Sequence, residues 1–182
     1  MKGNFRTNFS VGRLLNSEYK GFNPKGLNRA SWWIGYNPSE TVRMNVFAEL
    51  AREINFDELT LGDSFFFGTF NSFQLTDKIR LSPSLRYSQM KRLNSTDTFF
   101  ANYIARLNFN YQFNQNLSFR LVSELNTDSG QYLIQPLLQW NPTPFTIFYV
   151  GGNNKYLHND KFDAYRLEDA QLYLKFQYQL GD

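Results

Sequence analysis

The chain has 182 residues, with 19 Lys and Arg against 16 Asp and Glu, a single His, no Cys, 19 Phe, 11 Tyr and 3 Trp. The absence of Cys excludes disulfide frameworks, thiol nucleophiles and Cys-ligated zinc, and the single His excludes multi-histidine metal sites. The net charge of +3 is too small and too dispersed for a nucleic-acid-binding surface, and no apolar run is long enough for a transmembrane helix.

Alternation of apolar and polar residues with a period of two recurs along the chain, whereas helical periodicity is nearly absent. The length fits one domain, so residues 1–182 are expected to form a single β domain. In chain order, we predict about ten strands: residues 4–13, 28–36, 40–52, 63–75, 78–92, 99–113, 117–126, 131–140, 145–153 and 169–180.

The segment 103–113 shows the alternation most clearly. One face carries aromatic and aliphatic side chains, and the other carries amides and an arginine. Two segments are ambiguous, because 64–73 is aromatic on both faces and 145–150 is apolar on both. The apolar face of 103–113 holds Tyr103, Ala105, Leu107, Phe109, Tyr111 and Phe113, and the polar face holds Arg106, Asn108, Asn110 and Gln112.

The predicted connections alternate between short turns and longer loops. The short turns are rich in Asn, Pro, Asp and Ser, and they lie at 37–39, 76–77, 114–116 and 141–144. Most of the others are longer, at 14–27, 53–62, 93–98 and 154–168. An even number of strands of about ten residues with this alternation is typical of an up-and-down antiparallel transmembrane β-barrel of the bacterial outer membrane. The barrel is predicted to have 8–12 strands, with short periplasmic turns, longer external loops and lipid around its apolar face.

A soluble lipocalin-like ligand-binding barrel has the same alternation with its faces inverted, since its interior is apolar. Two features favour the membrane barrel. The polar side is composed of Asn, Gln, Ser and Arg, with little Lys or Glu, unlike a solvated surface. Aromatic residues stand near predicted strand ends, where the girdles of a membrane barrel lie. They are Trp32, Tyr36, Tyr111, Phe113, Trp140 and Phe145.

The segments 103–113, 117–122, 136–151 and 172–178 resemble the C-terminal barrel of a family of Bacteroidetes-type outer-membrane proteins of unknown function. Members of that family have an N-terminal part similar to a family-nine carbohydrate-binding module. The resemblance implies an outer-membrane barrel linked to saccharide handling within a larger surface assembly. It also implies that the chain is the C-terminal part of a longer protein or a compact relative. Gly181-Asp182 departs from the aromatic ending usual in that family.

One segment suggests catalysis. His158 lies in a predicted loop with Asp160 and Asp163, and small barrel enzymes place a His at their external rim as a general base. The sequence marks no nucleophile, and a solvated surface His is the simpler interpretation. The acidic residues also lack the ligand spacing of a calcium site, so neither a metal nor a cofactor is predicted.

The polar face is predicted to point into the barrel lumen. Two interpretations remain open: a filled structural interior, which amides and paired charges favour, and an Arg-rich conduit that favours anions. The predicted lumen-facing residues are Arg6, Arg43, Glu49, Arg80, Arg86, Arg106, Arg120, Glu124 and Lys175.

The sequence therefore favours a membrane-embedded anchoring, binding or transport module for a saccharide or another small ligand. A small outer-membrane hydrolase with its site near His158 is the first alternative, and the soluble carrier is the second. Substitution of His158 separates the first two classes, since only the hydrolase loses activity.

Overall fold

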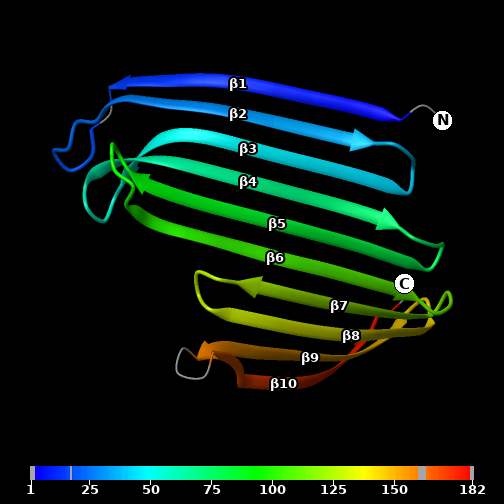
Figure 1. Ribbon diagram of the computed structural model, residues 1–182. Coiled ribbons are helices and arrows are strands. Elements are labelled where there is room, and N and C mark those ends of the chain that lie inside the picture. The colour runs from blue at the N-terminus through cyan, green and yellow to red at the C-terminus, as the bar shows by residue number, and fades with distance from the viewer. Residues whose placement is uncertain (1–2, 17, 160–162, 181–182) are drawn as a thin grey trace. The chain divides into compact units, whose positions relative to one another are not determined.

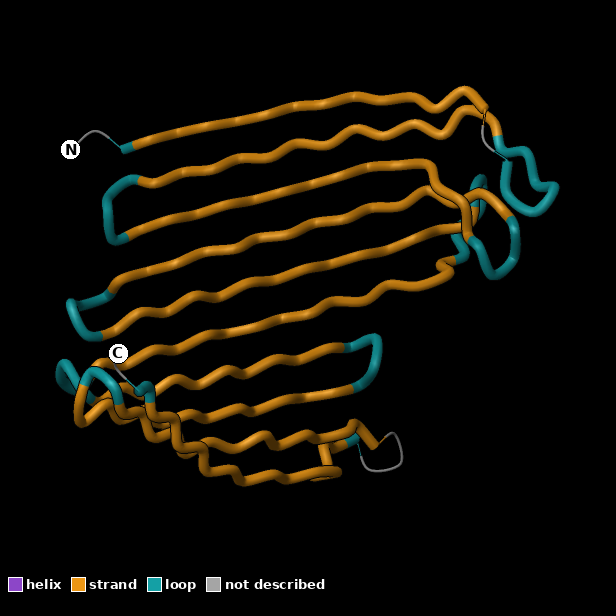
Figure 2. The backbone as a smooth tube through the Cα atoms, turned by 180° about the vertical axis from the view of Figure 1, so that it is seen from behind, coloured by secondary structure: helices purple, strands orange, loops and turns teal. Residues whose placement is uncertain are grey.

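The computed structural model describes residues 3–16, 18–159 and 163–180. They form an all-β structure of ten strands, and no helix occurs in these ranges (Figures 1 and 2). The strands are β1 (Asn4–Asn16), β2 (Lys25–Asn37), β3 (Val42–Asn55), β4 (Thr60–Gln74), β5 (Ile79–Arg92), β6 (Thr98–Gln112), β7 (Leu117–Asn126), β8 (Gln131–Thr143), β9 (Thr146–Asn159) and β10 (Ala164–Tyr178).

The strands form one antiparallel up-and-down sheet in the order of the chain, from β1 to β10. Each strand for which the register is known pairs antiparallel with its neighbour in sequence, as in the pairs Phe9 with Trp32 and Phe176 with Phe148. β1 and β10 are the two edges of the sheet, and no pairing between them is found in the described residues. The prediction of an all-β, antiparallel, up-and-down sheet is therefore confirmed. The sheet is not closed, because β1 and β10 are not paired in the described residues.

All ten predicted strands occur, but several extend beyond their predicted ends. β2 begins at Lys25, β3 ends at Asn55, β9 ends at Asn159 and β10 begins at Ala164. Most connections at this end are therefore shorter than predicted, the one between β1 and β2 remains long, and the one between β7 and β8 keeps its predicted bounds of 127–130. The added segments mix polar and apolar residues without a regular period of two, so alternation could not reveal them, yet their backbone groups still pair across the ladder. We call this end of the strands the loop end and the other the tight-turn end.

Asn and Thr side chains shape the turns. The Asn114 Oδ1 atom accepts hydrogen bonds from the backbone N–H groups of Asn116 and Leu117, at 2.9 and 3.0 Å. Asn55 and Asn126 bind the backbone two and three residues ahead in the same way at the loop end. Thr76 does so through its hydroxyl. These Asx and ST turns explain why the short polar segments between the alternating stretches of the sequence coincide with strand ends.

The contacts divide the chain into two compact units. Unit 1 comprises Met1–Asn71 and Leu85–Tyr103, and unit 2 comprises Ser72–Ser84 and Ile104–Asp182. Each is described separately below. In the described part of the chain, no helix is long and apolar enough to span a membrane.

Neither unit has a conventional hydrophobic core. Across the described residues, the buried hydrophobic side chains are Ala51, Met90 and Val122, with exposed fractions of 8%, 6% and 7%. Large apolar side chains are instead widely exposed, including Leu50 at 62% and Trp140 at 48%. An apolar surface of this extent requires a covering partner or an apolar solvent.

Candidate functional site

The polar face of unit 2 carries the predicted charges of β6, β7 and β10. Arg106 lies directly opposite Glu124, and its Nη1 atom is 3.0 Å from the carboxylate Oε2. Arg120 lies opposite Asn110, two residues along β7 from Val122. Lys175 lies opposite Tyr149, with its Nζ atom 5.6 Å from the ring centroid, a cation–π distance.

The polar face of unit 1 is built in the same way. Arg6 on β1 lies opposite Gly35 on β2, and Gly35 lies opposite Asn45 on β3, so Arg6 and Asn45 share a face. Arg43 and Glu49 are an even number of residues from Asn45 along β3 and therefore lie on that face too. Arg86 shares that face, because the adjacent Tyr87 points to the other face and contacts Phe65. The structure thus groups the predicted polar residues of each unit on one face. Whether that face lines a lumen stays a prediction.

Charged residues that the sequence reading omitted complete an ion-pair network at the loop end of unit 1. The guanidinium of Arg29 reaches Glu49 at 3.5 Å and Glu53 at 2.8 Å. The Ser64 hydroxyl donates to the second oxygen of Glu53 at 2.9 Å. Arg29 precedes an aromatic run in the sequence, and its pairing partners on the next strand become visible only once the register is known.

Cations and carboxylates are distributed unequally along the strands of unit 2. Closer to the loop end, Lys155 pairs with Glu168 at 2.6 Å and Arg106 pairs with Glu124 at 3.0 Å. At the tight-turn end the strands carry Arg80, Arg120 and Lys175, and the nearby acid Asp77 lies in the turn between β4 and β5.

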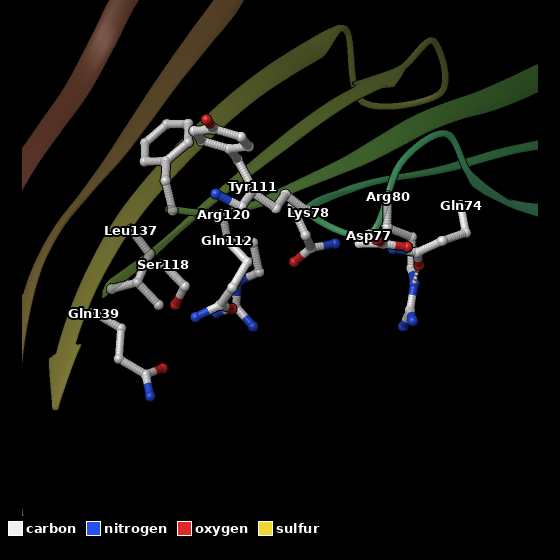
Figure 3. Close-up of a pocket in the computed structure, with 12 residues that line it drawn as sticks. Gln74, Asp77, Lys78, Arg80, Tyr111, Gln112, Ser118, Arg120, Leu137 and Gln139 are labelled. Atoms are coloured by element: carbon white, nitrogen blue, oxygen red, sulfur yellow. Dashed lines mark hydrogen bonds between the residues drawn. The ribbon is translucent and has the colours of Figure 1, made fainter. Parts of the chain in front are cut away.

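A cleft opens on the polar face of unit 2 at this tight-turn end (Figure 3), and its volume is about 370 Å³. In Figure 3 the side chains of Arg80, Arg120 and Gln139 point to one side of the sheet, whereas Tyr111 points to the other. We call this the polar cleft. Its lining residues are Gln74, Asp77, Lys78, Arg80, Asn110, Tyr111, Gln112, Ser118, Phe119, Arg120, Leu137 and Gln139.

The apolar face of unit 2 carries two rows of aromatic side chains. At the tight-turn end Trp140 stacks on Phe148, with ring centroids 5.3 Å apart, and Phe148 contacts Phe176 at 5.1 Å. At the loop end Tyr132 contacts Tyr156 and Tyr165, both at 6.0 Å. The side chains between the rows are mostly aliphatic, and they include Leu138, Val150, Leu172 and Leu174.

The structure resolves the facing of the ambiguous aromatic strand in unit 1. Phe65 and Phe67 lie with Leu85 and Tyr87 on the apolar face. Phe66 lies on the polar face, because its ring contacts Phe47 at a centroid distance of 5.6 Å, and Phe47 shares its strand face with Glu49. The polar face of unit 1 therefore includes aromatic rings, which alternation alone did not predict.

The two faces also differ in crowding. Ala51 and Val122 belong to the polar face by register, being paired with Arg29 and with Asn108. Met90 belongs to it as well, since its side chain packs within 2.8 Å of the position that a Cβ on Gly62 would take. All three buried hydrophobic side chains of the described residues therefore lie on the polar face. The apolar face is the more open one.

His158 lies at the loop end on the apolar face, next to the tyrosine row. Its Nε2 atom is 3.2 Å from Asp163 Oδ1, and its ring contacts Tyr165 edge-on with centroids 5.3 Å apart. Asp160 lies outside the described residues. A His–carboxylate contact is one part of a catalytic constellation.

Comparisons with known protein families, curated proteins and solved structures found no match. The resemblance to the outer-membrane family with a carbohydrate-binding module therefore stays a prediction from the sequence. Among the described residues, no group of three His, Cys, Asp or Glu side chains is arranged to hold a metal ion.

Proposed function

We propose that this chain is a bacterial outer-membrane β-barrel that serves as a membrane-embedded anchoring, binding or transport module. The observation that carries the proposal is the contrast between the two faces. The polar face is crowded and contains the buried side chains, whereas Leu50 and Val150 on the apolar face are 62% and 41% exposed. A soluble barrel has the opposite arrangement, with its crowded face apolar.

The aromatic rows of unit 2 support a bilayer as the apolar solvent. Tyr132 and Trp140 mark the two rows on β8, and at about 3.3 Å per residue they are separated by about 26 Å along the strand. An outer-membrane barrel has an outward apolar band about 25 Å tall between two aromatic girdles. Tyr, Trp and Phe are suited to these levels because their rings tolerate both lipid and water.

The exposed edges of the sheet support closure. All described side chains of β10, and those of β1 from Asn4 to Leu14, are exposed, and both strands alternate between polar and apolar residues. An unpaired edge strand exposes a row of backbone N–H and C=O groups, which is unfavourable in a bilayer. Pairing of β1 with β10 would satisfy these groups and complete the up-and-down barrel.

The ligand class follows from the polar face and from the family resemblance together. We propose a saccharide or another small polar ligand, passed or held for a larger surface assembly. Amide side chains supply donors and acceptors for hydroxyl groups, and the polar face of unit 2 offers Gln135, Asn153 and Gln139. Gln135 and Asn153 bind each other across the strands at 3.0 Å.

The deciding experiment measures how the full chain partitions between buffer and uncharged detergent micelles, with the heat sensitivity of its gel mobility read on the same sample. A membrane barrel requires the amphiphile to fold and runs as a compact band that boiling retards. A folded monomer in plain buffer would contradict the proposal, since the apolar face would then be solvated.

A rim hydrolase remains a second candidate because His158 contacts the carboxylate of Asp163. If the chain hydrolyses lipid or peptide esters, His158→Asn should abolish the activity while the barrel still folds. Equal activity of the variant and the natural chain would remove His158 from the mechanism. The control is Tyr165→Phe, which retains the ring contact with His158.

A further inference from the structure

The polar cleft of unit 2 contains positive charge that the protein itself does not neutralise. The guanidinium of Arg120 makes no hydrogen bond or ion pair with any described residue. Arg80 donates to the amide oxygen of Gln74 at 2.7 Å, and Lys78 donates to the backbone carbonyl of Phe113 at 3.2 Å. Both acceptors are uncharged. Asp77 is the single carboxylate among the lining residues, so the cations of the cleft are in excess.

The same face shows that this excess is local. Arg106 stands on the neighbouring strand, yet Glu124 lies opposite it and binds its guanidinium at 3.0 Å. The partner opposite Arg120 on β6 is Asn110, and the partner opposite it on β8 is Leu137. Arg106 thus has a carboxylate opposite it in the sheet, whereas Arg120 has none.

Neutral donors surround the unpaired guanidinium. Gln112 and Gln139 lie on the two sides of Ser118 in the cross-strand register. The Gln112 amide nitrogen donates to the backbone carbonyls of Asn114 and Leu117, whereas Gln139 gives one of its two N–H donors to Asn141 at 3.1 Å and keeps the other. The Ser118 hydroxyl adds another donor. A planar guanidinium with amide and hydroxyl donors beside it suits the oxygens of a carboxylate or phosphate group.

We propose that the polar cleft is a binding site for a small oxyanion, a carboxylate or a phosphate group, with Arg120 as its principal charge and Arg80 as the second. The site does not rest on the membrane proposal, because all its lining residues belong to unit 2 and the argument uses only their charges and contacts. A volume of about 370 Å³ accommodates a small anion with its water.

The test is a calorimetric titration of the full chain, folded in uncharged maltoside micelles, with sodium phosphate and separately with sodium succinate. Sodium chloride holds the ionic strength constant. We expect saturable binding of at least one anion and about tenfold weaker binding in Arg120→Gln, since a charge-assisted bidentate contact is lost. A further arm adds phosphatidylglycerol to the micelles. If this lipid competes with the added anion, a lipid headgroup is the source of the phosphate. If the lipid does not compete, the ligand is a soluble anion.

Arg43→Gln is the matched control, because Arg43 is also on the polar face but belongs to unit 1. Its affinity should stay within about twofold of the natural chain, as expected for a charge outside the site. No saturable binding, or an equal loss in both variants, would overturn the proposal. Should Arg120→Gln fail to fold, Arg80→Gln replaces it. Should the chain fold in plain buffer, the titration is run there, so the membrane proposal can fail without the anion site failing.

Discussion

At the scale of single residues, the neighbour across the strand decides what a charge does. Arg106 and Arg120 are chemically identical and lie on the same polar face, yet Glu124 pairs with the former while the latter has an amide opposite it. The sequence alone placed both residues in one class. Their difference became visible only when the register assigned each of them a partner.

The Arg106–Glu124 ion pair should contribute modestly to stability. Its side chains are 43% and 20% exposed, so solvent screens the attraction, and we expect a coupling energy of about 0.5 kcal/mol. A double-mutant cycle of Arg106→Gln and Glu124→Gln in urea denaturation measures it. Arg120→Gln should change the urea midpoint little. Fully additive effects of the two pair substitutions would show that the contact contributes nothing.

A second residue-scale prediction concerns Gly151. A Cβ there would overlap the ring of Tyr173, which lies across the glycine from the neighbouring strand. Gly151→Ala should lower the free energy of unfolding by about 1 kcal/mol, because the ring must move. At Gly152 the nearest atom is 3.4 Å from the added Cβ, so Gly152→Ala is the control and should be milder.

The cause is tested in the same urea series by adding Tyr173→Ala. If ring overlap is responsible, Gly151→Ala has almost no further effect in that background. If Gly151→Ala lowers the free energy of unfolding equally in the Tyr173→Ala background, the destabilisation arises in the backbone of β9 and not from the ring.

At the scale of the strands, alternation predicted all ten elements because one face is apolar almost throughout. It failed at the loop ends, for example in β9 from Asn153 to Asn159, where both faces are largely polar. It also left the facing of Phe65, Phe66 and Phe67 open, since consecutive identical rings carry no period. The contacts with Tyr87 on one face and Phe47 on the other settle that question.

The facing of β8 allows a direct test of which face meets lipid. Leu138 lies on the apolar face between the aromatic rows, and Leu137 lies on the polar face within the cleft. Leu138→Arg should destabilise the folded chain in bilayers by about 2 kcal/mol, whereas Leu137→Arg should be tolerated. The measurement is the urea midpoint of unfolding from vesicles, followed by the heat-sensitive gel band. Greater damage from Leu137→Arg would mean that the polar face is not the water-filled one.

At the scale of the whole molecule, the polar face of each unit carries its paired charges toward the loop end and its unpaired cations toward the tight turns. Paired charges such as Arg29 with Glu53 and Lys155 with Glu168 lie toward the loop end. The cations near the tight turns, including Arg6, Arg43 and Arg80, have no carboxylate partner among the described residues. In the barrel proposed above, the filled interior is therefore expected toward the loop end and the anion-favouring space toward the tight turns.

Closure of the barrel requires β1 to pair with β10, and the absence of natural cysteines makes this directly testable. Ser10 lies on the polar face of β1, opposite Ser31. We combine Ser10→Cys with a cysteine at each of three polar-face positions of β10, Gln171, Tyr173 and Lys175. One of the three pairs should form an intramolecular disulfide in micelles, because paired strands bring Cα atoms within about 6 Å.

Leu172→Cys and Leu174→Cys, each combined with Ser10→Cys, are the matched controls on the apolar face of the same strand. Their side chains point away from Ser10 in a paired sheet, so neither should crosslink. The readout is the faster mobility of the crosslinked monomer on a non-reducing gel. Disulfide-linked dimers would instead show that the exposed edges pair between two copies of the chain. Equal crosslinking from both faces would mean that β10 does not hold a fixed register beside β1, and the closed barrel would have to be abandoned.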